Sequence, residues 1–129
     1  MKEILAVDDN VVDNLINEIV LKRAFPDHKV IVISDSSEAL SYFKTNRTKL
    51  PSLIVLDINM PVVSGWDLLE ELSSYDQETN VFMLTSSIFK EDEKRARTYS
   101  CLKGYFVKPL DEASAEQMRQ VLDANKQTI

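Results

Sequence analysis

Residues 53–57 read Leu-Ile-Val-Leu-Asp, four apolar residues in a row that end in an acid. A run this short and this continuously apolar is typical of a parallel strand that is covered on both faces. Four other short apolar runs are also predicted to be strands: Ile4–Val7, Val30–Ile33, Val81–Leu84 and Tyr105–Val107. The sequence therefore predicts five strands.

Segments with helical periodicity separate these strands. Between the first two, apolar residues recur at the spacing of a helix that packs one stripe against a sheet: Val12, Leu15, Ile16, Ile19 and Val20. Similar spacings predict three more helices, around Ala39, Leu40 and Phe43, around Trp66, Leu69 and Leu72, and around Met118, Val121 and Leu122. Asp35 or Ser36 can cap the second helix. The segment Lys90–Tyr99 is almost wholly polar and predicts a weakly anchored helix, with Ala96 and Tyr99 facing inward.

The alternation of strands and helices predicts the fold class. Right-handed crossovers between consecutive strands give a parallel sheet with helices on both faces. We therefore expect an α/β fold with an open, doubly wound, five-stranded parallel sheet. The length of 129 residues fits a single domain. Because the helix–strand alternation runs almost to Ile129, residues 1–129 are expected to form one domain without an attached output domain.

Composition argues against several classes of function. The chain has 15 basic and 21 acidic residues, a formal net charge of -6, so direct binding to nucleic acid is not expected. No apolar stretch approaches the roughly 20 residues of a membrane span. The N-terminus lacks the pattern of a signal peptide, and the single cysteine, Cys101, excludes an internal disulfide. Both features indicate the cytoplasm. Only Gly65 and Gly104 are present, which excludes the glycine-rich nucleotide-binding loops.

The residues at the ends of the predicted strands carry the candidate chemistry. Asp8 and Asp9 follow the first strand, Asp57 the third, Thr85 the fourth and Lys108 the fifth. The carboxyl ends of parallel strands meet at one edge of a sheet. Three acids at that edge repel one another unless a cation is present, and Mg²⁺ prefers oxygen ligands. The expected site could bind a phosphoryl group, and one carboxylate could accept it as an aspartyl phosphate.

Four motifs at these strand ends resemble the receiver domain of two-component response regulators. They are Val7-Asp8-Asp9-Asn10, Leu56-Asp57-Ile58-Asn59-Met60-Pro61, Leu84-Thr85-Ser86 and Val107-Lys108-Pro109. Each motif is weak alone, but their order and separations are specific, and the resemblance covers essentially the whole chain. It implies a flavodoxin-like topology and a stand-alone receiver similar to the chemotaxis regulators.

The resemblance also implies roles for these residues. Asp57 is expected to be the phosphoacceptor. Asp8, Asp9 and Asp57 are expected to hold Mg²⁺ together with the backbone carbonyl of Asn59. Lys108 is expected to pair with the phosphoryl group, and its bond to Pro109 is cis in the family.

Further roles concern the switch and the lifetime of the phosphorylated state. Thr85 is expected to contact a phosphoryl oxygen, and Tyr105, the family's switch aromatic, to turn inward when the threonine hydroxyl moves. Asn59 and Ser87 occupy positions that lie over the path of the attacking water in the family. They are expected to tune dephosphorylation.

The resemblance implies a signalling protein rather than an enzyme with external turnover. A histidine kinase or a histidine phosphotransfer protein would phosphorylate it, and it would act on an unknown downstream protein, as a final effector or as a phosphorelay intermediate. Two alternatives stay open. One is a Mg²⁺-dependent phosphohydrolase with an aspartyl-phosphate intermediate, although such enzymes need a second acid where Asn59 stands. The other is an adaptor that works without phosphorylation.

Each motif also has a plainer interpretation. The acidic pair Asp8-Asp9 can simply cap a helix, and Thr85 can belong to an ordinary loop. His28 is expected to lie at the surface in a polar loop. Two departures from the family pattern also stand out: Cys101 replaces a common glycine, and the fourth helix is unusually charged.

Overall fold

We analysed a computed structural model of the chain, which describes residues 2–76, 79–86 and 89–127. Its elements follow one another in strict alternation: β1 (Lys2–Val7), α1 (Val11–Ala24), β2 (His28–Ile33), α2 (Ser36–Thr45), β3 (Leu53–Asp57), α3 (Gly65–Ser73), β4 (Asn80–Thr85), α4 (Lys90–Ala96), β5 (Leu102–Val107) and α5 (Glu112–Gln127). Within the described residues, no helix combines the length and apolarity needed to cross a membrane. All five predicted strands are present.

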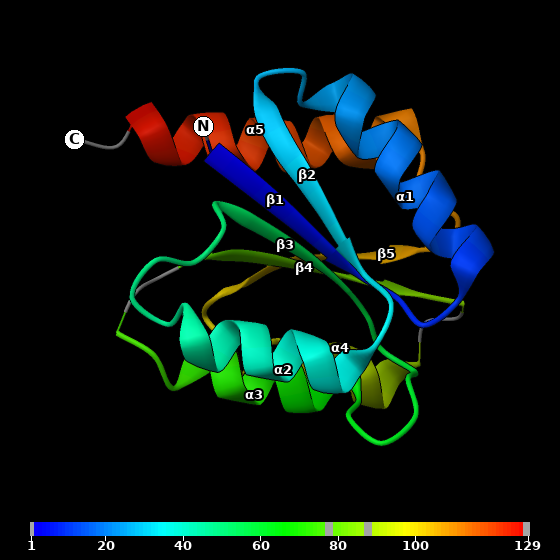
Figure 1. Ribbon diagram of the computed structural model, residues 1–129, viewed down its shortest axis with the longest axis vertical. Helices are drawn as coiled ribbons and strands as arrows, with labels where there is room; N and C mark the ends of the chain where they lie inside the picture. Colours follow the sequence, from blue (N-terminus) through cyan, green and yellow to red (C-terminus); the bar gives the residue numbers. More distant parts are fainter. Residues whose placement is uncertain (1, 77–78, 87–88, 128–129) are drawn as a thin grey trace.

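The strands form one parallel sheet in the order β2-β1-β3-β4-β5. Figure 1 shows α1 and α5 on one face of this sheet and α2, α3 and α4 on the other. The strand order reverses direction between β1 and β3, which places a ligand-binding crevice at their carboxyl ends. The predicted doubly wound α/β fold with flavodoxin-like topology is confirmed.

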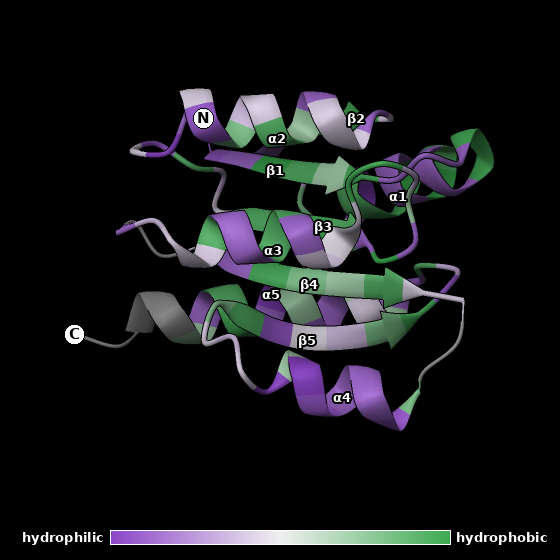
Figure 2. Ribbon diagram, turned by 90° about the horizontal axis from the view of Figure 1, so that it is seen from below, coloured by the Kyte–Doolittle hydropathy of each residue, from purple (hydrophilic) through white to green (hydrophobic). Residues whose placement is uncertain are grey.

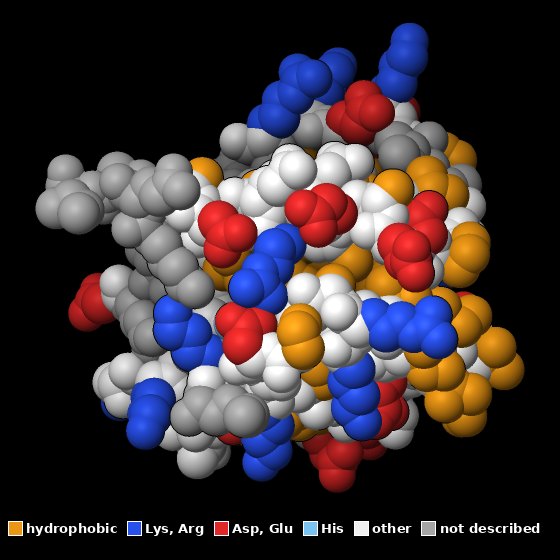
Figure 3. Space-filling view, turned by 90° about the horizontal axis from the view of Figure 1, so that it is seen from above, with side chains coloured by type: hydrophobic (Ala, Val, Ile, Leu, Met, Phe, Trp, Pro, Cys, Tyr) orange, Lys and Arg blue, Asp and Glu red, His pale blue; other side chains and the backbone are white. Residues whose placement is uncertain are grey.

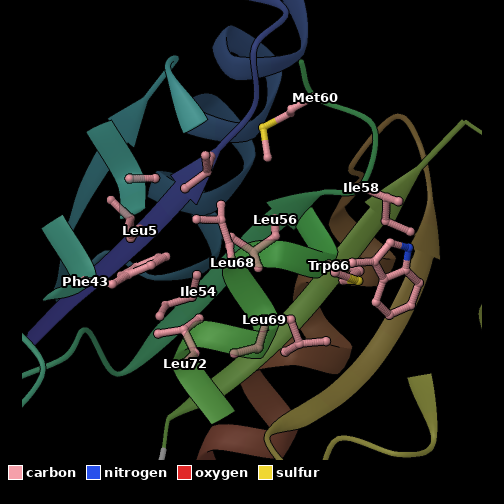
Figure 4. Close-up of a cluster of buried hydrophobic side chains, with 14 of the residues drawn as sticks. Leu5, Phe43, Ile54, Leu56, Ile58, Met60, Trp66, Leu68, Leu69 and Leu72 are labelled. Carbon is pink, nitrogen blue, oxygen red and sulfur yellow. The ribbon is translucent and has the colours of Figure 1, made fainter. Parts of the chain in front are cut away.

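The two faces of the sheet have separate hydrophobic cores. On the side of α2 and α3, Leu5, Ile54 and Leu56 pack with Phe43 and Leu69 (Figure 4). On the other side, Leu53 and Val55 pack with side chains of α1 and α5. Because β3 is central, all five of its residues are buried, which explains its continuously apolar sequence.

Local sequence signals set several of the helix boundaries. The Asp35 side chain accepts from the backbone N–H groups of Ser37 and Glu38, which confirms the predicted cap of α2. Helix α4 ends at Ala96, three residues before the predicted end at Tyr99, and none of its residues is fully buried. Figure 2 shows this helix as the most uniformly hydrophilic one next to β5. The weak anchoring predicted for it is consistent with that surface.

The predicted orientation of the first helix is wrong. Val12, Leu15 and Ile19 were expected against the sheet, but their exposed fractions are 64, 57 and 46%. Helix α1 instead buries Asn14 and Asn17, together with Leu21. The Asn14 side-chain amide donates to the backbone carbonyl of Asp8 at 2.5 Å, so a buried polar contact joins this face of the helix to the end of β1. Ile16 and Val20 lie at the border between the buried and exposed faces.

The prediction for His28 is also wrong, because this residue begins β2 and its side chain is buried. Its Nδ1 lies 3.0 Å from Asp27 Oδ1, and the ring meets Phe25 edge-on. Arg119 of α5 binds the same Asp27 carboxylate with two nitrogens and holds its pKa well below the usual range. His28 therefore lies where the start of β2 contacts α5, at the end of the sheet away from the strand carboxyl ends.

Candidate functional site

The predicted acids lie together where β1 and β3 end. Asp8 and Asp57 are buried and Asp9 is exposed, and oxygen atoms of the three carboxylates lie within 4.8 Å of one another. Asp57 is the last residue of the buried strand β3, so the packing of that strand fixes its position. Burial, and next the charge of Asp8, raises the pKa of Asp57 to about 6. Holding the ionised Asp57 carboxylate at the end of β3 therefore costs electrostatic free energy.

Lys108 supplies the positive charge of the site. Its Nζ lies 2.8 Å from Asp8 Oδ2 and 3.2 Å from Asp57 Oδ1, as the sequence predicts. The peptide bond between Lys108 and Pro109 is cis, which confirms the expectation from the resemblance. The Lys108 backbone N–H donates to the Thr85 carbonyl at 2.7 Å and so fixes the end of β5 beside β4. The surrounding carboxylates hold the pKa of Lys108 above its usual range, against the effect of burial, so the ammonium is charged.

Sequence reasoning missed one member of this group. Asp13, in the first turn of α1, accepts a hydrogen bond from Lys108 Nζ at 2.9 Å. An acid at this place is common because it stabilises the positive end of a helix. Because this ordinary role explains the acid, the sequence did not indicate that Asp13 also contacts a lysine 95 residues further along the chain.

The three carboxylates fit a hard divalent cation. Oxygen ligands from one or two carboxylates, completed by water or phosphate oxygens, are the usual Mg²⁺ environment. Asp8 Oδ1 accepts from the Asn10 backbone N–H at 2.9 Å. Asp8 Oδ2 is buried and lacks a hydrogen-bond partner among the described residues, although it contacts the Lys108 ammonium as an ion pair. A buried carboxylate oxygen that accepts no hydrogen bond is suited to bind a metal ion.

The loop after β3 wraps the site tightly. The Val63 N–H donates to the Pro61 carbonyl at 2.7 Å, and Val62 between them has a φ of 66°, a costly value for a β-branched residue. A Cβ atom on Gly65 would collide with the Asp57 carbonyl oxygen, so only glycine permits α3 to begin here. Asn59 in this loop is exposed, where its side chain is open to solvent. Ser87 lies outside the described residues.

Thr85 and Tyr105 lie at the opposite side of the site from α1. Thr85 ends β4 and is buried. Tyr105 is half-buried and packs against the core that contains α3, with its hydroxyl 3.4 Å from Asp92 of α4. Burial and the charge of Asp92 raise the pKa of Tyr105 to about 12, and a hydrogen bond with Thr85 partly offsets this effect. The predicted switch pair is therefore in contact, and the Tyr105 ring is half-buried.

Comparison with known proteins gives the family. The response regulator receiver domain family matches residues 4–122. The chain belongs to this family. It is 30% identical to the two-component response regulator ARR7 of Arabidopsis thaliana over 95% of its own length and 63% of that protein. It is also 30% identical to response regulator Rcp1 of Synechocystis over 70% of its own length and 66% of that protein. The chain thus spans slightly less than two thirds of these curated relatives.

A solved structure supports the same relation. A two-component response regulator from Legionella pneumophila is 29% identical to this chain, with a TM-score of 0.78 over 96% of this chain and 99% of that one. The receiver fold is therefore shared with this relative. The contact between Asp13 and Lys108 comes from the structure of this chain itself.

Proposed function

We propose that this receiver accepts a phosphoryl group on Asp57 from a histidine kinase or a histidine phosphotransfer protein, with Mg²⁺ as cofactor. One observation carries the proposal: a buried carboxylate, two neighbouring acids and a lysine ammonium meet at the end of β3. Removing charges from water is costly, and neighbouring carboxylates repel one another unless cations neutralise them. The arrangement suits a group that arrives with negative charge and its own metal ion.

In the proposed reaction, an Asp57 oxygen attacks the phosphorus of phosphohistidine. The new O–P bond forms as the P–N bond breaks, and the imidazole leaves with the bonding electron pair and takes up a proton. Asp8, Asp9, Asp57 and the Asn59 carbonyl would hold Mg²⁺, which would supply positive charge to neutralise the acids and the phosphoryl group. Lys108 offers a charge-assisted hydrogen bond to a second oxygen, and Thr85 offers its hydroxyl to a third.

The lifetime of the aspartyl phosphate depends in this proposal on Asn59 and Ser87. Neither side chain is a strong base at neutral pH, so water attacks slowly and without general-base help. This favours signalling over the alternative of a phosphohydrolase, which needs an acid or base at the position of Asn59. The adaptor alternative gives no reason for Asp57 to be held at a raised pKa.

An exposed apolar surface next to the site favours a protein as phosphodonor. We call Val11, Val12, Leu15 and Ile19 the α1 patch; all four are exposed. Figure 3 shows hydrophobic side chains gathered at the end of the molecule where α1 begins. Val62, which is 92% exposed, adds an apolar side chain from the loop after Asp57. Apolar surface beside a reacting carboxylate is suited to dock a partner that brings its phosphohistidine to Asp57.

The output is proposed to be a separate protein that recognises the surface of α4, β5 and α5. When Thr85 turns to the phosphoryl group, it would vacate space into which the Tyr105 ring turns, and the contact of its hydroxyl with Asp92 of α4 would change. The charged helix α4 would then move relative to β5. We place this exchange in the cytoplasm, in accord with the single cysteine of the chain.

Incubation with Mg²⁺ and acetyl phosphate, followed by intact-mass measurement, tests the proposal. We expect one labile adduct of a single phosphoryl mass on the wild-type chain and none on the Asp57→Asn variant. Steady release of phosphate at high turnover would indicate the phosphohydrolase, and an unchanged mass would indicate the adaptor. Full labelling of Asp57→Asn would mean that another residue accepts the group.

A second measurement tests the switch. The Thr85→Ala variant should still be phosphorylated on Asp57, because the nucleophile and its cations are intact. Its NMR spectrum should show a weaker phosphorylation-dependent change at Tyr105 and along α4. A response as large as that of the wild type would contradict the coupling and leave the phosphorylation site standing.

A further inference from the structure

The ion pair between α1 and β5 gives Asp13 a place in the site. Lys108 Nζ donates to Asp13 Oδ2 at 2.9 Å, while the Asp13 side chain is 28% exposed and the Lys108 side chain 15%. The two residues are 95 positions apart, so this contact depends on the tertiary fold. An acid that served the helix alone would have no need to reach into the site.

The number of carboxylate oxygens around the Lys108 ammonium equals the number of its N–H bonds. Lys108 has three N–H bonds, and three carboxylate oxygens surround it, at 2.8 Å from Asp8, 2.9 Å from Asp13 and 3.2 Å from Asp57. The hydrogen bond to Asp13 and the ion pair with Asp8 together hold the ammonium at the end of its stem. The ammonium then lies 3.2 Å from Asp57 Oδ1, beside the place where a phosphoryl oxygen would arrive.

Asp8 and Asp13 differ in what else they can do. Asp8 belongs to the group of three carboxylates that could hold a metal ion, and Asp13 does not. When Asp8 serves as a metal ligand, its oxygens are shared between two cations. Of these two acids, Asp13 is then the one that interacts with Lys108 and with no metal ion.

We propose that Asp13 is a positioning residue, which holds the Lys108 ammonium in line with the phosphoryl group that Asp57 accepts. This inference rests on the proposed function. Without the Asp13 carboxylate, the lysine stem is free to rotate and the ammonium spends less time beside Asp57. Phosphoryl transfer then slows, whereas binding of Mg²⁺ changes little.

The test measures two quantities on the full chain. One is the first-order rate constant for phosphorylation by acetyl phosphate at saturating Mg²⁺, followed by intact mass. The other is the Mg²⁺ dissociation constant of the unphosphorylated protein, from an NMR titration. We expect Asp13→Ala to lower the rate constant on the order of tenfold, since loss of alignment is costly in such reactions. Its Mg²⁺ dissociation constant should change by less than about threefold, because charges outside the ligand set act through screening solvent.

Two further variants separate position from charge. Asp13→Asn keeps an oxygen that can accept from Lys108 and should fall between Asp13→Ala and the wild type. Glu18→Gln removes an acid from the same helix that pairs with Lys22 and not with Lys108, so its rate should match the wild type. Denaturant unfolding of each variant confirms that the measured chain is folded.

Several outcomes would overturn the inference. Asp13→Ala could react as fast as the wild type or faster, which would mean that its charge only repels the donor. Glu18→Gln could slow the reaction as much as Asp13→Ala, which would indicate a general effect of charge. A parallel loss of Mg²⁺ affinity would assign Asp13 to the metal site. A wild-type chain that gains no phosphoryl mass would instead refute the proposed function itself.

Discussion

Helices α1 and α3 follow the two strands that carry Asp8 and Asp57, yet they attach to the sheet in opposite ways. Helix α3 buries Trp66, Leu68, Leu69 and Leu72, and its start is closed by a capping box at Ser64. Helix α1 buries two asparagines and exposes the α1 patch. The apolar residues of α3 therefore stabilise the fold, whereas the α1 patch remains available to a partner. A helical apolar stripe beside a site can serve either purpose.

The largest expected effect concerns the α3 side of this comparison. Leu69 is fully buried between α3 and the sheet (Figure 4). Leu69→Ala should lower the free energy of unfolding by about 2–5 kcal/mol, because it removes apolar contacts and leaves a cavity. Urea denaturation measures this change. Leu69→Met, which nearly conserves the volume, should cost less than about 1.5 kcal/mol. A loss as small for Leu69→Ala would mean that the core of α3 is loosely packed.

The next effect concerns the polar attachment of α1. Asn14 donates from its side chain to the Asp8 carbonyl in a buried place. Asn14→Ala should cost about 1–3 kcal/mol of unfolding free energy, because a buried carbonyl loses its donor. Leu15→Ala on the exposed face of the same helix should stay within about 0.5 kcal/mol of the wild type. If the two costs were reversed, the α1 patch would be part of the core and the contrast with α3 would fail.

A third effect depends on pH and concerns the acid that both helices flank. The pKa of Asp57 is raised to about 6, above its value of about 3.9 in an unfolded chain. Its protonated form therefore stabilises the fold below pH 4, and this contribution is lost as the pH rises through 6. Without divalent cations, Asp57→Asn should become more stable relative to the wild type between pH 4 and pH 8, by about 1–3 kcal/mol. A difference in unfolding free energy that stayed constant with pH would contradict the raised pKa.

Much of this molecule could be predicted from its sequence, and for identifiable reasons. The composition of β3 indicates burial on both faces, and alternation with helices places Asp8, Asp57, Thr85 and Lys108 at one edge. Each of these inferences uses only the order of elements and a period of two or 3.6 residues.

The errors have a common cause in side-chain contacts that hydrophobic periodicity does not show. The spacing of α1 shows that one face is apolar, but it does not show that Asn14 on the other face binds the Asp8 carbonyl in a buried place. His28 is buried because β2 begins two residues earlier than predicted and because Arg119 of α5 binds its neighbour Asp27. Asp13 is recognisable only once β5 has brought Lys108 to it. The period of the apolar residues contains none of these contacts.

The smallest expected effect on stability decides what the α1 patch is for. Leu15 and Ile19 are 57 and 46% exposed, so replacing both with serine should change the free energy of unfolding by less than about 1 kcal/mol. Labelling by acetyl phosphate should be unchanged, because Asp57 and its neighbours are intact. Transfer from a histidine kinase or phosphotransfer protein that labels the wild-type chain should fall about tenfold or more, as expected when central apolar contacts of an interface are lost.

Phe89 at the start of α4 is 59% exposed, and Phe89→Ser is the matched control that should keep the rate of transfer. If the serine variant of α1 were labelled by the protein donor at the wild-type rate, α1 would not be the docking helix. The apolar stripe of α1 would then differ from the apolar stripe of α3 only because no hydrophobic core packs against it.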